Sequence, residues 1–300
     1  MSDARRPSDG QVGDAELANP FEGAYATRRL RANGIELSCA DWNPQGPATI
    51  LLVHGLHAQG HVWDPIAAEL ARDHRVLCPD LRGHGDSAWT RDQGYWTRHF
   101  VADLHALLQE LNAGPVLYVG HSLGARIGYV YGAEQPRGLR GMLLADTAPE
   151  TPKTAARLVS RIVGGTGAPP GFRTRGEARD HYAAAYPEWQ PVFHLLYALH
   201  QLRRNWADRF VNKHDPDLYW ITRSAGLSEV PYLWECAARA AVPAQVIWGE
   251  RSPYLDRAML DRVVATMPRA EPVVLPAGHA IPREIPDAFT EQIRRFDATL

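Results

Sequence analysis

Short apolar runs alternate with longer segments of helical period along most of this 300-residue chain, and this alternation constrains the fold more than any other feature. The apolar runs are nearly continuous, which is typical of parallel strands covered on both faces. The predicted strands are residues 48–55, 75–83, 115–122, 139–146, 244–250 and 271–279, and the predicted helices are residues 61–73, 97–111 and 125–135. The pattern predicts an α/β fold with a mostly parallel central sheet flanked by helices.

The alternation stops after Asp146. Residues 147–242 lack a convincing parallel strand and carry helix-like pieces, rich in aromatic residues and separated by Gly and Pro. We therefore expect a core domain formed by residues 23–146 and 243–300, with an inserted helical cap at residues 147–242. Residues 1–22 are polar and without period, which predicts a disordered tail.

Charge and composition exclude several classes of partner. The chain has 32 Lys and Arg against 34 Asp and Glu, so its formal net charge of −2 predicts no general attraction to nucleic acid or to an anionic membrane. The N-terminus lacks the apolar segment of a secretory signal, and no run is long enough to span a bilayer, so we expect a cytoplasmic protein. Cys39, Cys78 and Cys236 are scattered among apolar residues, which predicts buried free thiols.

The sequence GHSLG places Ser122 between a predicted strand and a predicted helix. Gly120 and Gly124 flank the serine two residues away on either side, where a sharp strand-to-helix turn has no room for larger side chains. Such a turn exposes the serine hydroxyl, and the helix N-terminus with the backbone N–H of Leu123 can stabilise a developing negative charge. The pattern favours a nucleophilic serine over an ordinary serine N-cap.

With two further segments, the sequence resembles the α/β-hydrolase fold superfamily from about Tyr25 to the C-terminus. HGLHAQGHVW, after the third strand of that fold, resembles the oxyanion loop of the family, and PDLRGHGDS at residues 79–87 resembles the turn after its next strand. The resemblance implies an α/β-hydrolase fold in which the backbone N–H groups of Leu56 and Leu123 form the oxyanion hole.

A base is expected near the end of the chain, because the family's order of catalytic residues is serine, acid and histidine. LPAGHAIPREIPDAF offers His279, which follows the last predicted strand and a glycine. His54 and His121 are interpreted as structural residues of the oxyanion loop and of the serine turn.

The acid is where this sequence departs from the family pattern. Most relatives have an aspartate just after the seventh strand, but WGERSPYLD has Ser252 and Pro253 at the two usual positions. Asp146, at the end of the sixth strand, is the favoured replacement, since some members of the fold place the acid there. Asp256 and Glu250 remain alternatives, and so does a dyad without an acid.

The leading hypothesis is a serine hydrolase that acts on an ester, lactone or related acyl bond of a small, moderately apolar molecule, with Trp63, Trp189 and Trp220 near the substrate. A second reading is a non-hydrolytic relative, such as a cofactor-free dioxygenase, a lyase or a cyclase, and a third is a catalytically weak small-molecule-binding protein. No cofactor is implied, and the three histidines of HGLHAQGH are not expected to share a metal ion. The oligomeric state is left open.

Overall fold

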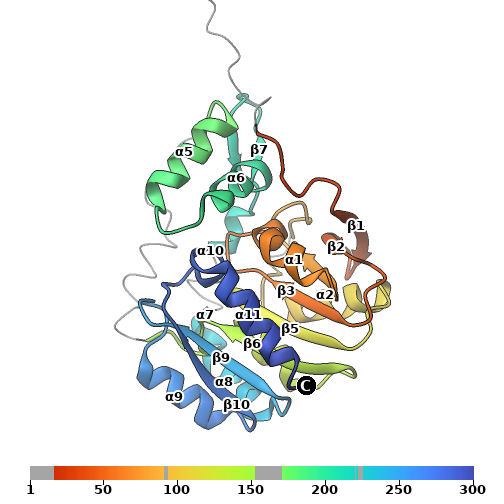
Figure 1. Cartoon of the computed structure of the whole chain (residues 1–300), viewed down its shortest axis with the longest axis vertical. Helices are drawn as coiled ribbons and strands as arrows, with labels where there is room; N and C mark the ends of the chain where they lie inside the picture. Colours follow the sequence, from red (N-terminus) through yellow and green to blue (C-terminus); the bar gives the residue numbers. More distant parts are fainter. Residues whose placement is uncertain (1–16, 91–93, 153–170, 220, 222–225) are drawn as a thin grey trace, which may run out of the picture.

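The computed structural model describes residues 17–90, 94–152, 171–219, 221 and 226–300. Within them, eight strands form one sheet in the order β1-β2-β4-β3-β5-β6-β9-β10, and β3 to β10 of that sheet run parallel (Figure 1). The strands are β1 (Tyr25–Ala32), β2 (Ile35–Trp42), β3 (Thr49–Val53), β4 (Arg75–Pro79), β5 (Val116–His121), β6 (Leu139–Ala145), β9 (Ala244–Gly249) and β10 (Ala270–Leu275). All six predicted strands are present, and the predicted α/β-hydrolase architecture is confirmed.

The β1–β2 hairpin was not among the six predicted strands. It pairs antiparallel with β4 through β2, at one edge of the sheet. Its turn is Asn33-Gly34, with φ of 48° and 78°, which suits the two-residue hairpin turns that Asn-Gly favours. The Asn-Gly pair was therefore the local signal for this hairpin.

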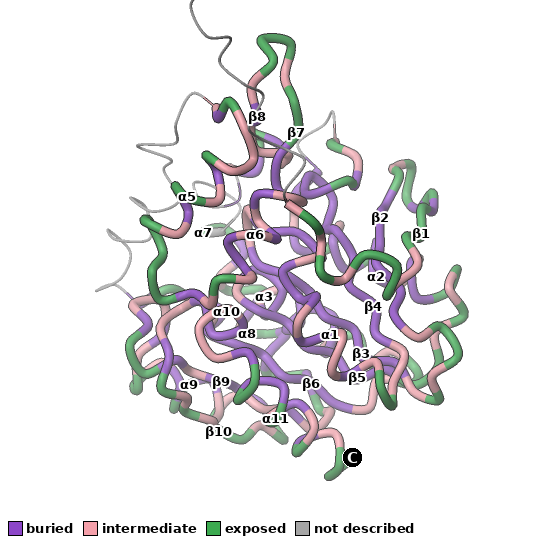
Figure 2. The backbone as a smooth tube through the Cα atoms, turned by 45° about the horizontal axis from the view of Figure 1, so that its top comes forward, coloured by how far each residue is buried: buried purple, intermediate pink, exposed green. Residues whose placement is uncertain are grey.

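Helices cover both faces of the sheet and create two apolar cores. Residues that alternate along β3 separate between them: Leu51 and Val53 belong to one cluster, and Ile50 and Leu52 to the other. The first cluster contains residues of α2 (Thr97–Glu110), α3 (Leu123–Ala133), α8 (Val230–Arg239) and α9 (Arg257–Thr266), and the second those of α1 (Asp64–Leu70) and α11 (Pro286–Asp297). Figure 2 shows the resulting burial along the strands.

Part of the segment between β6 and β9 lies apart from the central sheet, and part of it packs with the core (Figure 1). Helices α5 (Arg175–Ala185) and α6 (Pro191–His200) lie with strand β7 (Leu202–Arg204) at one end of the molecule (Figure 1). Strand β7 pairs antiparallel with β8 (Phe210–Asn212), so the range predicted as a helical cap also contains a two-stranded sheet. The 3-10 helix η3 (Pro216–Leu218) and the short α7 (Gly226–Ser228) follow.

Helix α8 falls inside the predicted cap range of 147–242 but packs with the core. Its Leu233, Cys236 and Ala237 are fully buried in the first cluster, and Glu229, just before it, pairs with Arg126 of α3 at 3.1 Å. This amphipathic face explains why the helix lies on α3.

The predicted tail is described only in part, because residues 1–16 lie outside the described residues. Residues 17–22 pack against the domain: the ring of Phe21 lies 6.0 Å from that of Trp42, and the Asn19 side chain lies 3.3 Å from Nε2 of His200 in α6. This short segment therefore contacts both β2 and α6.

The three cysteines are buried and free, as predicted. None of the helices in the described part of the chain combines the length and the apolar character needed to cross a membrane.

Candidate functional site

Ser122 lies in a strained turn between β5 and α3, with φ of 55° and ψ of −113°. The flanking glycines are required by close backbone approach. A Cβ atom on Gly120 would lie 2.4 Å from the carbonyl oxygen of Gly124, and one on Gly124 would lie 2.1 Å from that of Val53. The backbone N–H of Ser122 donates to the Ala145 carbonyl at 2.9 Å, which fixes the turn against the end of β6. The sequence pattern therefore folds into the expected sharp elbow.

Three of the predicted site residues come together at the carboxyl ends of parallel strands. Nδ1 of His279, after β10, lies 2.6 Å from Oδ2 of Asp146, after β6, and its Nε2 lies 3.2 Å from Oγ of Ser122. With Nδ1–H donating to the carboxylate, Nε2 is left as an acceptor for the serine hydroxyl. We refer to this arrangement as the Ser122–His279–Asp146 chain; its geometry suits proton transfer from the serine to the imidazole.

Asp146 has no exposed surface, and its backbone φ is 55°. Hydrogen-bond donors compensate for this burial: Oδ1 accepts the backbone N–H of Gly249 at 3.0 Å, and Oδ2 accepts the hydroxyl of Ser252 as well as Nδ1–H of His279. The carboxylate is thus held by the last residue of β9 and by side chains that follow β9 and β10.

The two alternative acids lie elsewhere. Asp256 is the N-cap of α9, where its Oδ1 accepts the backbone N–H of Met259 at 2.8 Å. Glu250 is exposed in the turn after β9. His279 forms its carboxylate contact with Asp146 rather than with either of them.

Three neighbours of the imidazole were not identified as site residues from the sequence. Ser252 occupies the position where most relatives have the acid, and here its hydroxyl holds Asp146. The ring of Tyr254 stacks on that of His279 at 3.8 Å, and burial raises the pKa of its phenol to about 12. His121 donates from Nε2 to the His279 carbonyl at 2.7 Å, and burial holds its pKa well below the usual range. The available signal was the serine at the acid's usual position.

The loop after β3 approaches the serine closely. A Cβ atom on Gly55 would lie 3.0 Å from Cβ of Ser122, which brings the next residue, Leu56, beside the elbow. Among the described residues, the backbone N–H groups of Leu56 and Leu123 have no hydrogen-bond partner. Two free N–H groups on either side of a serine are what an oxyanion hole requires.

His54 holds this loop to the loop after β4. Its Nδ1–H donates to the Gly55 carbonyl at 2.8 Å, and its Nε2 accepts the backbone N–H of Leu81 at 3.0 Å. Burial lowers the pKa of His54 to about 4, so the ring is neutral and can make both bonds. The structural interpretation of His54 agrees with these contacts.

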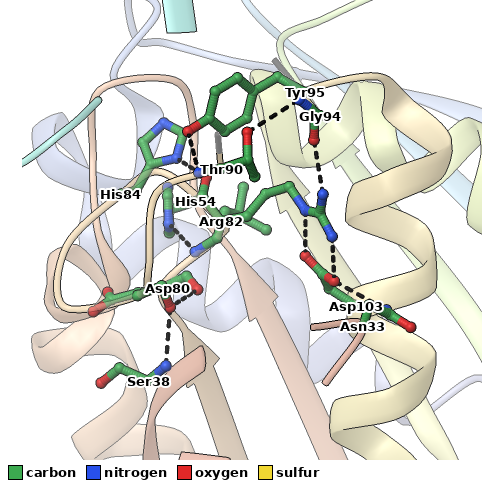
Figure 3. A network of polar contacts seen from close by, with 12 residues as sticks. Asn33, Ser38, His54, Asp80, Arg82, His84, Thr90, Gly94, Tyr95 and Asp103 are labelled. Atoms are coloured by element: carbon green, nitrogen blue, oxygen red, sulfur yellow. Dashed lines mark hydrogen bonds and ion pairs between the residues drawn. The ribbon is translucent and has the colours of Figure 1, made fainter. Parts of the chain in front are cut away.

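The loop after β4 is itself fixed by buried polar contacts (Figure 3). Arg82 forms two hydrogen bonds with the carboxylate of Asp103 in α2, at 2.6 and 2.7 Å. Asp80 accepts the backbone N–H of Gly60 at 2.6 Å and so ties this loop to the segment that follows Leu56. These buried polar contacts therefore hold the backbone beside Ser122 in place before any substrate binds.

Comparison with known proteins identifies the family of this chain. The family model described as the alpha/beta hydrolase fold matches residues 48–282. The chain belongs to the α/β-hydrolase family.

The relatives of this α/β-hydrolase family member include proteins named as hydrolases, esterases and lipases. It is 35% identical to a 3-hydroxybutyrate-oligomer hydrolase of Cupriavidus necator over 136 residues, which cover 45% of each chain. It is 27% identical to an esterase of Mycobacterium tuberculosis over 279 residues, which cover 89% of this chain and 87% of the esterase. The chain spans less than half the length of several curated relatives that it matches, at 45%, 42% and 40%.

A solved structure of E-2-(acetamidomethylene)succinate hydrolase has the same fold. The two structures superpose with a TM-score of 0.80 over 91% of this chain and 99% of that one, at 22% sequence identity.

The three predicted pocket tryptophans differ in their positions. The interpretation of Trp63 is wrong: its side chain has no exposed surface, and its ring lies 6.3 Å from that of Phe289, in the core beneath α11. The 3-10 helix η2 (Gly60–Trp63) turns this indole inward, where it fills the space between sheet and helix. Trp189 lies just before α6, in the same apolar cluster as Ala280, the residue after His279. Trp220 lies outside the described residues.

One group of side chains has the residue types of a metal site. The ligand atoms of His61, Asp64 and His200 all lie within 4.8 Å of one another. The two imidazole rings are stacked, however, with centroids 3.9 Å apart and planes 20° apart. A metal ion binds in the plane of an imidazole ring, so one ring would have to turn before both could bind the same ion. The observed geometry does not fit a preformed site.

Proposed function

We propose that this member of the α/β-hydrolase family is a serine hydrolase that cleaves an ester, lactone or related acyl bond of a small, moderately apolar molecule. The observation that carries the proposal is the Ser122–His279–Asp146 chain, with its distances of 3.2 and 2.6 Å. An alcohol is a poor nucleophile until a positioned base takes its proton, and His279 is placed to act as that base.

In the proposed reaction, Oγ of Ser122 attacks the carbonyl carbon while Nε2 of His279 takes the hydroxyl proton. Asp146 stabilises the imidazolium and maintains its orientation. The backbone N–H groups of Leu56 and Leu123 donate to the oxyanion of the tetrahedral intermediate. Collapse of this intermediate expels the alcohol, which receives the proton from His279.

The second half of the reaction consumes water. His279 deprotonates a water molecule, which attacks the acyl-enzyme and passes through a second tetrahedral intermediate to release the acid and free Ser122. The electron pairs and protons of both halves come from the substrate, water and these side chains, so the reaction requires no cofactor.

Aromatic residues of the predicted cap are the reason for proposing an apolar substrate. Trp189 packs with Phe193 and Leu196 directly against Ala280, and the ring of Tyr186 stacks on that of Trp189 at 4.2 Å. The cluster of Trp189 includes Ala280, the residue that follows His279, so an apolar part of a small molecule bound at Ser122 can reach these side chains.

The test is turnover of 4-nitrophenyl butyrate together with covalent labelling by a fluorophosphonate, which reacts readily only with an activated serine. Wild type should hydrolyse the ester and become labelled, whereas Ser122→Ala should do neither. Heat-denatured wild type is the control for non-specific labelling. An inert, folded wild type would overturn the proposal in favour of non-hydrolytic chemistry or ligand binding, and equal labelling of Ser122→Ala would exclude Ser122 as the nucleophile.

A further inference from the structure

A cation lies between the cap and the proposed reaction centre. Arg283 belongs to α10 (Ile281–Glu284), which begins two residues after His279. Its guanidinium lies over the ring of Trp189, 4.5 Å from the ring centroid. Its backbone carbonyl accepts the N–H of Gln190 at 3.0 Å, so this stretch of the cap is also attached to α10.

The surroundings of this guanidinium are aromatic and imidazole groups. Burial lowers the pKa of Arg283, and the nearby phenols of Tyr197 and Tyr186 partly oppose that effect. Burial is the main cause of the lowered pKa of His121, followed by His279 and then by the Arg283 cation, and Nε2 of His121 donates to the His279 carbonyl. The Arg283 side chain is therefore partly shielded from water, and its charge acts on His121, the residue that bonds to the His279 carbonyl.

No carboxylate of the described residues pairs with Arg283. The acid next to it in sequence, Glu284, is already used: it accepts the N–H groups of Gly278 and Ala280 and pairs with Arg251 at 3.1 Å. The undescribed residues within the cap sequence are 153–170, 220 and 222–225, and none of them is Asp or Glu.

Two other described arginines with little exposed surface have acidic partners. Arg82 pairs with Asp103 at 2.6 Å, and Arg75 pairs with Asp41 at 2.9 Å. Removing a cation from water is costly unless an anion or hydrogen-bond acceptors replace the water. Arg283 has no such acidic partner among the described residues, and it lies close to where the proposed function places the substrate.

We propose that Arg283 binds a carboxylate carried by the substrate, so that the preferred substrates are acyl compounds with a free acid group. This inference rests on the proposed function, because it assigns the substrate class of the same site. One planar guanidinium matches one carboxylate in a two-bond pair, with the aromatic side chains of the cap excluding water around it.

The test compares esters that differ only in the acid group. One pair is 4-nitrophenyl hydrogen glutarate and its methyl ester, and shorter and longer pairs are built on succinate and adipate. For at least one chain length, wild type should have a higher kcat/KM for the acid than for the methyl ester. Arg283→Gln should lower this acid-to-neutral ratio by about 10- to 100-fold, as expected for the loss of a hydrogen-bonded charge pair.

Two further variants keep the result interpretable. Arg283→Lys preserves the charge without the planar fork and should retain part of the selectivity. Arg98→Gln is the matched control, because Arg98 also lies over an indole, that of Trp96 at 5.7 Å, but on the exposed surface of α2. It should leave the ratio unchanged, and each variant's thermal denaturation checks its folding.

A binding measurement separates this inference from the proposed function. Glutarate should raise the melting temperature of Ser122→Ala and should fail to do so for the Ser122→Ala, Arg283→Gln double variant. That result would support the carboxylate site even if wild type hydrolysed neither ester, in which case the proposed reaction alone fails. Active wild type with an acid-to-neutral ratio below one at every chain length, or a ratio that Arg283→Gln leaves unchanged, would overturn the inference.

Discussion

Replacing Asp146 by asparagine should abolish most of the activity without disturbing the fold. Oδ1 of Asp146 accepts the Gly249 N–H at 3.0 Å, so the amide oxygen of the substituted side chain must take that place and its NH₂ group must take the place of Oδ2. The NH₂ group then faces Nδ1 of His279, which in the native protein lies 2.6 Å from a carboxylate oxygen. Because a donor faces it, Nδ1 must lose its hydrogen, and Nε2 carries the proton instead.

An imidazole protonated at Nε2 donates to Oγ of Ser122 and cannot take its proton. The expected loss in kcat is about 10⁴-fold, equivalent to about 5 kcal/mol of activation free energy. The assay is 4-nitrophenyl butyrate turnover, with near-UV circular dichroism to verify the fold.

Two variants test whether this loss is specific to Asp146. Asp256→Asn should be nearly silent, since asparagine is as good an N-cap as aspartate, and Glu250→Gln changes only an exposed side chain. If Asp146→Asn keeps more than about a tenth of wild-type activity, or if either control loses as much, the assignment of the acid is refuted.

Three further predictions concern the supporting residues. Ser252→Ala removes a hydroxyl donor to Asp146 and should lower kcat about ten-fold, whereas Ser252→Thr should restore it; equal activity of all three proteins would argue against a positioning role. Gly124→Ala should destabilise the fold by about 3 kcal/mol in urea denaturation, because its Cβ would meet the Val53 carbonyl at 2.1 Å, while Gly114→Ala has open space and serves as control. The folded-state pKa of His54, about 4, is below its unfolded value of about 6.5, so the unfolded chain binds more protons between these values and stability falls as the pH falls. This residue alone should lower the free energy of unfolding by about 3 kcal/mol across that window, and His54→Asn should make the measured slope shallower by about one proton.

Features encoded by neighbouring residues could be predicted from the sequence. The strands follow from apolar runs that must be buried on two faces, and the elbow follows from two glycines whose missing side chains permit the close approach of Val53 and Gly124. His279 could be proposed as the base because its position after the last strand matches the family order. These signals are local or depend on chain order, so they can be recognised without knowledge of the tertiary packing.

Other expectations depended on which neighbouring element a side chain packs against. Helical spacing around Trp63 indicated an apolar environment but did not distinguish a pocket from the core, and packing against α11 decided for the core. Helix α8 resembled cap sequence, yet its buried face fits α3. An apolar stripe in the sequence indicates that one face of a helix is buried, but it does not identify the element that covers this face.

Sequence by itself determined the fold, the serine elbow and the histidine, while tertiary structure decided which acid reaches that histidine. Strands β6 and β9 are adjacent and parallel, with Ala145 beside Ile247, so their carboxyl ends meet at the same edge of the sheet. That adjacency brings together Asp146 and Ser252, which are 106 positions apart in the chain, and supplies the hydroxyl that holds the carboxylate. The physical reason is that strand order is set by packing across the whole sheet, and a contact between two strand ends leaves no mark in either segment alone.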